Sequence, residues 1–395
     1  MHDTIIVGGG PVGSYLAAKL ARLGYKVLVL DKKGAPGQDI CCTGIVGRQC
    51  LDLLAVDGNV IMGQASSATF FAPSGKSLRL WRDHEVAYIM NRPALDQTLV
   101  NRAAAASVQY LFSAQVTDFR MAADCLRVEA DVHGQKSSFA AKTAVIAAGF
   151  SSSLPEKLGL GKITDFIIGA QTEINMSSPA EVEIYIDQTL APGGFAWLVP
   201  TRDSKGLAGL MTRQSPQHLD RLVSSLKAQG KITSTEGLPA YDVIPLRPLP
   251  RTYAERVLVV GEAAGQVKPT TGGGIYYGLL CADIAADSLH HAFLTNDFSE
   301  SRLASYQKQW RDRLNKELQI GHWARRLYER LGNWQIERLH SLASNNGIPK
   351  LIAETEDFSF DWHGALILGM LKHLAGSAPV QALKALSRRN TAVHG

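Results

Sequence analysis

A glycine-rich turn between an apolar strand and a helix is the feature that most constrains the fold of this chain. Residues 4–7 form a β-branched run, and Gly8, Gly10 and Gly13 follow with the spacing Gly-x-Gly-x-x-Gly. The first glycine permits a tight turn, the second lets the backbone approach a pyrophosphate, and the third lets helix and strand pack closely. The helix N-terminus then faces the phosphates. In this context the spacing predicts a dinucleotide site.

The segment after the turn completes a βαβ unit. Leucines recur at helical spacing between residues 11 and 25, and residues 26–30 form a second apolar strand. The two strands are expected to be parallel, because a helix connects them. Asp31 ends the second strand, where a carboxylate accepts hydrogen bonds from the ribose hydroxyls of a dinucleotide.

Two later segments favour FAD over NAD as the dinucleotide. Residues 257–265 read as an apolar strand and a Gly-Glu-Ala-Ala-Gly turn. In flavoproteins of the hydroxylase and reductase type, a Gly-Asp segment at this place holds the ribityl chain, and Glu262 stands here for the usual aspartate. Arg92 and Asp96 resemble the Arg-x-x-x-Asp segment of the same superfamily, whose arginine approaches the diphosphate. An ordinary helical N-terminal turn is the alternative for this pair.

The order of strands and helices predicts an α/β fold with three parts. A Rossmann-like FAD-binding domain is expected to be discontinuous, over residues 1–160 and 250–295. Residues 161–249 alternate as strands and predict an inserted antiparallel-sheet substrate domain. Residues 296–395 are expected to form a helical C-terminal region.

Composition and charge exclude several other classes of protein. The net charge of +5 is too small to favour nucleic acid, but it is compatible with an anionic membrane surface or a phosphorylated ligand. The 5 cysteines include no Cys-x-x-Cys pair, and zinc-ligand spacing is absent, which predicts reduced thiols, a cytoplasmic location and no metal. The first residues do not resemble a signal peptide, and no apolar run approaches the roughly 20 residues of a membrane-spanning helix.

Three further segments narrow the resemblance to the geranylgeranyl reductase family. These enzymes belong to the p-hydroxybenzoate hydroxylase-like flavoproteins and use FAD to hydrogenate isolated double bonds of prenyl chains. Residues 268–279 are similar to the family's glycine stretch against the flavin ring, and residues 41–44, Cys-Cys-Thr-Gly, to its cysteine-containing turn. Residues 195–200, Phe-Ala-Trp-Leu-Val-Pro, resemble its aromatic strand beside the prenyl pocket. The resemblance covers roughly residues 1–285.

The resemblance implies a set of site residues. Cys41 and Cys42 are the expected catalytic residues, and which of the two matches the family's cysteine stays open. Phe195, Trp197 and Pro200 are the expected substrate-binding residues, with plain core packing as the alternative for Trp197 and for both cysteines. The expected FAD contacts are Gly8, Gly10, Gly13, Asp31, Cys41, Cys42, Gly44, Arg92, Val116, Glu262, Gly274 and Ile275.

The implied reaction is the hydrogenation of a geranylgeranyl-type chain on a lipid, diphosphate, chlorophyll or quinone. It needs a hydride from the flavin to one alkene carbon and a proton to the other, for which a cysteine thiol is the expected donor. An FAD-dependent monooxygenase or halogenase of the same fold is the alternative, and a flavin-binding redox relay or membrane-associated scaffold is a non-enzymatic one. Because no second nucleotide fingerprint follows a strand, the electron donor, NADPH or ferredoxin, stays open.

Peripheral membrane contact is expected from the C-terminal helices. Trp310, Trp323, Tyr328 and Trp334 accompany several arginines in this part of the chain. Amphipathic helices of such composition lie in the membrane interface. Ordinary helices that cover the sheet are the alternative.

Overall fold

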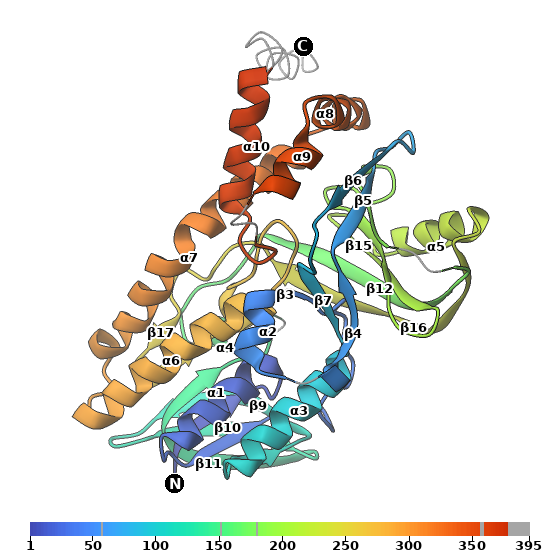
Figure 1. Ribbon diagram of the computed structural model, residues 1–395. Coiled ribbons are helices and arrows are strands. Elements are labelled where there is room, and N and C mark those ends of the chain that lie inside the picture. The colour runs from blue at the N-terminus through green and yellow to red at the C-terminus, as the bar shows by residue number, and fades with distance from the viewer. Residues whose placement is uncertain (57, 151, 179–180, 356–358, 378–395) are drawn as a thin grey trace, which may run out of the picture. The chain divides into compact units, whose positions relative to one another are not determined.

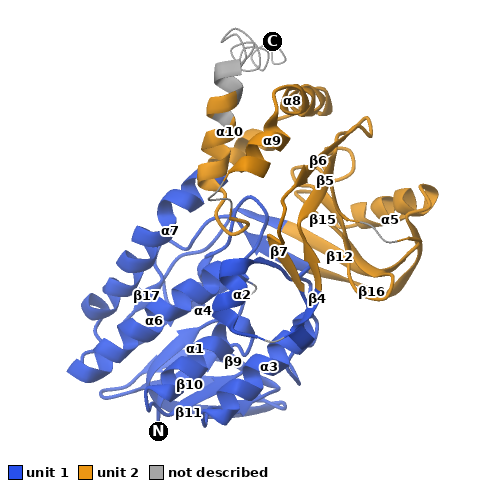
Figure 2. Ribbon diagram, in the orientation of Figure 1, with its two compact units in different colours: residues 1–62, 90–167, 242–322 blue, residues 63–89, 168–241, 323–395 orange. Residues whose placement is uncertain are grey.

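The structure is a computed structural model that describes residues 1–395 except 57, 151, 179–180, 356–358 and 378–395 (Figure 1). The chain divides into two compact units (Figure 2). Unit 1 comprises residues 1–62, 90–167 and 242–322, and unit 2 comprises residues 63–89, 168–241 and 323–395.

A largely parallel sheet forms the centre of unit 1. Its strands lie in the order β17 (Tyr253–Ala254), β18 (Val257–Val259), β11 (Gln135–Ile146), β1 (His2–Val7), β2 (Val27–Leu30) and β8 (Gln109–Leu111). The strands from β18 to β8 are parallel, and β17 is antiparallel to β18. All four residues of β2 are buried, which is typical of parallel strands covered on both faces. Two further strands, β9 (Ala114–Met121) and β10 (Leu126–Val132), extend the sheet: β10 pairs antiparallel with β11, and β9 pairs antiparallel with β10.

Helices of unit 1 accompany this sheet. They are α1 (Pro11–Arg22), α2 (Arg48–Leu54), α3 (Arg92–Ala105), α4 (Leu154–Lys157), α6 (Ile275–Thr295) and the first part of α7 (Glu300–Tyr328). The start of α7 is anchored by two fully buried aromatic residues. Tyr306 Oη donates to the carbonyl of Val259 at 3.0 Å, and Trp310 Nε1 donates to Thr252 Oγ1 at 2.9 Å. Residues 296–322 therefore belong with the sheet of unit 1.

Unit 2 is built on a second sheet, which has seven strands among the described residues. Its strands lie in the order β16 (Ile232–Pro245), β12 (Phe166–Met176), β15 (Lys205–Thr212), β14 (Ala196–Pro200), β13 (Val182–Tyr185), β5 (Ser67–Phe71) and β6 (Ser77–Trp81). The pairs from β12 to β13 are antiparallel, as is β5 with β6, whereas β13 and β5 are parallel. The pairing of β13 with β5 explains why residues 63–89 fall in unit 2, although the sequence assigned them to the FAD-binding domain.

Further elements complete the two units. The amphipathic helix α5 (His218–Ala228) buries Leu219, Leu222 and Leu226 in the core of unit 2. The C-terminal helices are α8 (Asn333–Asn345), α9 (Ile348–Glu354) and α10 (Gly364–Ser377). Short elements are β3 (Ile45–Gly47), η1 (Gly58–Val60), β4 (Ile61–Ala65), β7 (Ala87–Met90) and η2 (Gly261–Ala264). The predicted α/β class is confirmed, with a Rossmann-like part, an inserted and mainly antiparallel sheet, and C-terminal helices.

We predict that Gly13 is required for folding. A Cβ at Gly13 would lie 1.9 Å from the carbonyl oxygen of Gly8, so α1 would have to move away from the turn. Gly13→Ala should lower the free energy of unfolding by about 1–3 kcal/mol, the usual cost of overpacking, in urea denaturation of the apoprotein. Gly10→Ala is the matched control, because no atom lies within 4 Å of its Cβ position and its φ is −71°. Equal stability of the two variants would contradict this account.

Candidate functional site

The glycine turn follows β1. Neighbouring atoms leave no room for a side chain at two of its glycines, whereas the third glycine faces open space. Gly8 has a φ of +106°, and a Cβ there would lie 2.4 Å from the carbonyl oxygen of Ala147. Gly13 meets the carbonyl of Gly8, as described above. Gly10, by contrast, faces open space and caps α1 without a side-chain hydrogen bond. The first N–H groups of α1 therefore have no side-chain cap, which is the arrangement that binds a phosphate at a helix N-terminus.

Asp31 is held beside this turn by backbone groups. Its Oδ2 accepts from the N–H of Gly9 at 2.6 Å, and its Oδ1 accepts from the N–H of Lys33 at 2.8 Å. The carbonyl of Asp31 accepts from the N–H of Ala114 at 2.8 Å, where β9 begins. Val116 lies two residues further along β9. The predicted residues Gly8, Gly10, Gly13, Asp31 and Val116 are thus brought to one region, around the ends of β1 and β2.

Arg92 occupies the first turn of α3, next to the cysteine-containing turn. Asn91 caps α3 by accepting from the N–H of Ala94 at 3.1 Å. The Nη2 atom of Arg92 lies 3.3 Å from Asp96 Oδ1, and both side chains are largely buried. The turn reaches Arg92 at Gly44, where a Cβ would lie 3.2 Å from Arg92 Cγ. Burial opposes the charge of Arg92, but the nearby side chains of Cys42 and Asp96 favour it, and the pKa of Arg92 is raised on balance. Arg92 and Asp96 therefore form an ion pair between successive turns of α3. Arg92 also contacts the cysteine-containing turn.

Glu262 faces the start of α6. A Cβ at Gly274, which precedes Ile275 at the first position of α6, would lie 2.7 Å from Glu262 Oε1. Burial raises the pKa of Glu262 to about 7, and the carboxylate of Asp242 adds to the rise while Arg92 opposes it. The carboxyl group therefore exchanges its proton near neutral pH. Asp242, which lies in β16, carries no motif by which the sequence marks it as part of this cluster.

The two cysteines stand within the same cluster. Burial raises the pKa of the Cys41 thiol to about 12, and the nearby carboxylates of Asp242 and Glu262 contribute to the rise. Cys41 and Cys42 are both half-buried. Because its thiolate is disfavoured, Cys41 carries its proton across the whole neutral range. This arrangement suits a thiol that holds a proton and does not suit a thiolate nucleophile.

These residues of unit 1 fit a bound FAD. The open backbone at Gly10 and the uncapped start of α1 offer N–H donors to a diphosphate. Arg92 supplies a positive charge, Asp31 an acceptor for a ribose, and Glu262 an acceptor at the start of α6. The donors and acceptors match the anionic and hydroxyl-rich parts of the cofactor.

The predicted substrate residues lie in unit 2. The Trp197 indole on β14 covers Gly209 of β15, where a Cβ would lie 2.5 Å from Trp197 Cζ2. The rings of Phe195 and Trp197 are 5.8 Å apart, and both residues, like Pro200, are half-buried. Trp197 Nε1 is buried and has no hydrogen-bond partner among the described residues. Trp197 is thus packed on the sheet, and its ring also borders Phe195.

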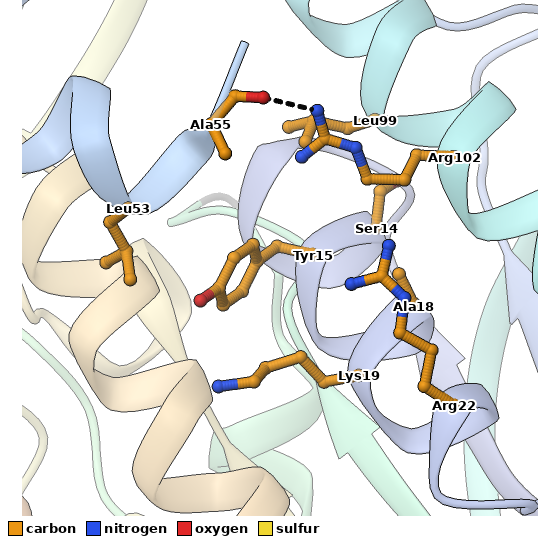
Figure 3. A pocket seen from close by; sticks show the side chains of 9 residues that line it. All are labelled: Ser14, Tyr15, Ala18, Lys19, Arg22, Leu53, Ala55, Leu99 and Arg102. Carbon is orange, nitrogen blue, oxygen red and sulfur yellow. Dashed lines mark hydrogen bonds between the residues drawn. The ribbon is translucent and has the colours of Figure 1, made fainter.

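A separate cavity of about 130 Å³ lies beside α1 (Figure 3). Tyr15 and Lys19 both bind the carboxylate of Asp283 on α6. Arg102 of α3 donates to the carbonyls at the end of α2, at 2.6 Å for Leu54 and 2.9 Å for Ala55. These polar groups join helices to one another. The cavity is lined by Ser14, Tyr15, Ala18, Lys19, Arg22, Leu53, Ala55, Leu99 and Arg102, of which the sequence analysis singled out none.

The chain is similar in sequence to known oxidoreductases. A family model described as pyridine nucleotide-disulphide oxidoreductase matches residues 2–175. The digeranylgeranylglycerophospholipid reductase of Methanocaldococcus jannaschii is 25% identical over 356 residues, which cover 86% of this chain and 90% of that protein. Digeranylgeranylglycerophospholipid reductase 1 of Methanococcoides burtonii is 28% identical over 339 residues, which cover 80% of this chain and 81% of that protein.

Solved structures share the fold over most of the chain. A geranylgeranyl bacteriochlorophyll reductase-like protein from Thermoplasma acidophilum has a TM-score of 0.84 at 21% identity, and the match covers 98% of this chain and 99% of that chain. The p-nitrophenol 4-monooxygenase of Pseudomonas putida has a TM-score of 0.72 at 17% identity, with 95% and 98% covered. At these identities the structural likeness concerns the fold alone. The sequence relatives confirm the predicted resemblance to the geranylgeranyl reductases, and with the family model they support the prediction of an FAD-dependent oxidoreductase.

Proposed function

We propose that this protein reduces carbon–carbon double bonds in a geranylgeranyl-type chain of a membrane lipid. The observation that carries the proposal is the cluster of Cys41, Cys42, Arg92 and Glu262 beside the nucleotide turn, in a chain whose curated relatives are named digeranylgeranylglycerophospholipid reductases. A monooxygenase shares the fold, but no site observation favours it over the reductase. The electron donor, NADPH or a ferredoxin, stays open. It does not affect assays in which the enzyme is reduced chemically.

Residues of unit 1 would hold the FAD. Gly10 and the start of α1 would contact the diphosphate, and Arg92 would balance its charge. Asp31 would accept from the adenosine ribose, and the backbone at Val116 would meet the adenine. Glu262 would accept from the ribityl hydroxyls, and the flavin ring would lie against the stretch that ends in Gly274 and Ile275. When bound and reduced, FAD supplies the hydride that one alkene carbon receives.

The protein must supply a proton for the other alkene carbon and exclude water from it. Cys41 Sγ holds a proton throughout the neutral range, because its pKa is raised to about 12 by burial and by neighbouring negative charges. Phe195, Trp197 and Pro200 would contact the prenyl chain, and the faces of the two aromatic rings would stabilise positive charge that develops on the alkene. The chain's own residues thus position the alkene and move the proton.

FAD binding is expected to depend on the open space at Gly10. Gly10→Val should abolish FAD binding because its side chain would occupy the place of the pyrophosphate. The apoprotein should remain folded, since no atom lies within 4 Å of the Cβ position. Flavin absorbance of the purified protein and titration of the apoprotein with FAD measure the effect. A yellow Gly10→Val protein, or a wild-type protein that takes up no FAD, would overturn the assignment of this turn.

Replacement of the thiol that donates the proton should slow the reduction without loss of FAD. Cys41→Ser and Cys42→Ser are each compared with wild type, using dithionite-reduced enzyme and a geranylgeranyl lipid. Turnover should fall by about 10²–10⁴-fold in the variant that lacks the donor, which is the usual contribution of a positioned acid. Cys125→Ser is a control, because Cys125 lies outside the cluster. Full activity of both single variants and of the double variant would remove the thiol role and leave the reductase proposal intact.

Membrane contact is proposed for the C-terminal helices. Trp323 and Trp334 are 52% and 49% exposed, and the Arg338 guanidinium lies 5.9 Å from the Trp334 ring. Trp310 is fully buried and the Tyr328 hydroxyl binds a backbone carbonyl, so these two do not join the surface that the sequence suggested. Among the described residues, no helix combines the length and the hydropathy needed to cross a membrane.

We expect the protein to float with phosphatidylglycerol vesicles at low salt. Exposed tryptophans beside arginines favour the interface of an anionic bilayer. The double variant Trp323→Ala/Trp334→Ala should bind the vesicles less, whereas Phe166→Ala, which removes an exposed aromatic outside these helices, should bind as wild type does. Absence of wild-type protein from the vesicle fraction would rule out the membrane contact.

A further inference from the structure

A loop of unit 2, residues 187–194, leads directly into the aromatic strand β14. Gly193 adopts a φ of +71°, and its N–H donates to Gln188 Oε1 at 2.7 Å. The carbonyl of Pro192 accepts from the N–H of Arg213 at 2.8 Å, just after β15. The loop is therefore folded on itself and tied to the neighbouring strand. Because residues 193 and 194 immediately precede Phe195, the position of the loop sets where the aromatic strand begins.

The second part of α7 binds the carbonyls at the end of this loop. Arg325 Nη2 donates to the carbonyl of Gly193 at 2.7 Å, and the Tyr328 hydroxyl donates to the carbonyl of Gly194 at 2.6 Å. Arg325 is only 4% exposed. A charge-assisted hydrogen bond in such a water-poor place is strong and directional.

Glu329 fixes the orientation of the Arg325 guanidinium. Its Oε1 accepts from Arg325 Nε at 3.0 Å and from Arg213 Nε at 2.9 Å. A buried positive charge needs such a partner, since an unpaired one would be costly. The carboxylate thereby links α7 to the segment after β15, and β15 is the strand that pairs with β14.

The start of α8 binds the other end of the loop. Asn333 Oδ1 accepts from the N–H of Gln188 at 2.9 Å, and Asn333 Nδ2 donates to Asp187 Oδ1 at 2.9 Å and to Thr189 Oγ1 at 3.0 Å. Two consecutive C-terminal helices thus hold both ends of one loop. These helices belong to the part of the chain that the sequence resemblance did not cover.

We propose that Arg325 and Tyr328 are positioning residues that determine which double bonds of the prenyl chain are reduced. They fix residues 193–197, and thereby the rings of Phe195 and Trp197 that would border the chain. Successive double bonds of a prenyl chain are one isoprene unit apart, so a displaced ring changes which bond reaches the flavin. This inference rests on the proposed function, in which the aromatic strand contacts the substrate.

A first experiment measures the clamp itself and does not depend on any substrate. Tyr328→Phe removes only the hydroxyl that binds Gly194, and Tyr25→Phe is the matched control, because it removes a hydroxyl that binds His290 Nδ1 at 2.7 Å in unit 1. Backbone hydrogen exchange of residues 190–197 in the FAD-loaded full-length protein should become about fivefold to tenfold faster in Tyr328→Phe, the effect of one lost hydrogen bond. It should stay unchanged in Tyr25→Phe. Exchange of residues 190–197 should be faster in Arg325→Met than in Tyr328→Phe. Arg325→Lys, which keeps a positive charge, should exchange more slowly than Arg325→Met.

A second experiment measures specificity with dithionite-reduced enzyme and a geranylgeranyl lipid. Mass spectrometry of the products should show an altered ratio of partly to fully reduced chains in Tyr328→Phe, and the wild-type ratio in Tyr25→Phe. Unchanged exchange in residues 190–197 would overturn the clamp. Faster exchange with an unchanged product ratio would overturn the role in specificity. A wild-type protein that reduces no prenyl lipid would overturn the proposed function and the specificity role with it, whereas the exchange result would still decide the clamp.

Discussion

The close approach of α1 to the end of β1 is the constraint on which the nucleotide site depends. The missing side chain of Gly13 lets the helix reach the carbonyl of Gly8, and the missing side chain of Gly8 lets the turn reach Ala147. This packing leaves the N-terminus of α1 open at Gly10 and carries Gly9 to the carboxylate of Asp31. Gly8 and Gly13 are therefore required by the fold, whereas Gly10 leaves open the space where we propose that the pyrophosphate binds.

The pKa values of Glu262 and Cys41 are set mainly by burial, in a cluster that contains the Arg92 cation. Arg92 lies near Asp96, Glu262 and Cys42, and burial opposes the charged forms of Glu262 and Cys41. A pKa of about 12 keeps the Cys41 thiol uncharged at neutral pH, whereas a pKa of about 7 leaves the Glu262 carboxyl group about half ionised there. Arg92 is thus a buried cation that is paired with Asp96, while the Cys41 thiol keeps its proton.

Local patterns predicted the parts of the site that are close in sequence. The glycine spacing, the strand before it and Asp31 all lie within one βαβ unit, so the sequence was enough to place them together. Asp242 was missed because a single aspartate near the end of a long strand has no distinguishing neighbours. The domain boundaries differ from the two units because β5 pairs with β13 across a long stretch of chain, and such pairing leaves no local signal. Arg325 and Asn333 were missed for a similar reason, since amphipathic helices conceal which of their polar residues reach inward.

An anaerobic single-turnover measurement tests the central claim most directly. The FAD-loaded protein is reduced with a stoichiometric amount of dithionite, mixed with a geranylgeranyl lipid without oxygen, and followed by flavin absorbance. If the protein is a prenyl reductase, the lipid will gain two hydrogens for each flavin that is reoxidised. The reason is that hydride transfer to the alkene oxidises the cofactor. Flavin that stays reduced until oxygen is admitted, and then yields an oxygenated product, would contradict the account and identify a monooxygenase.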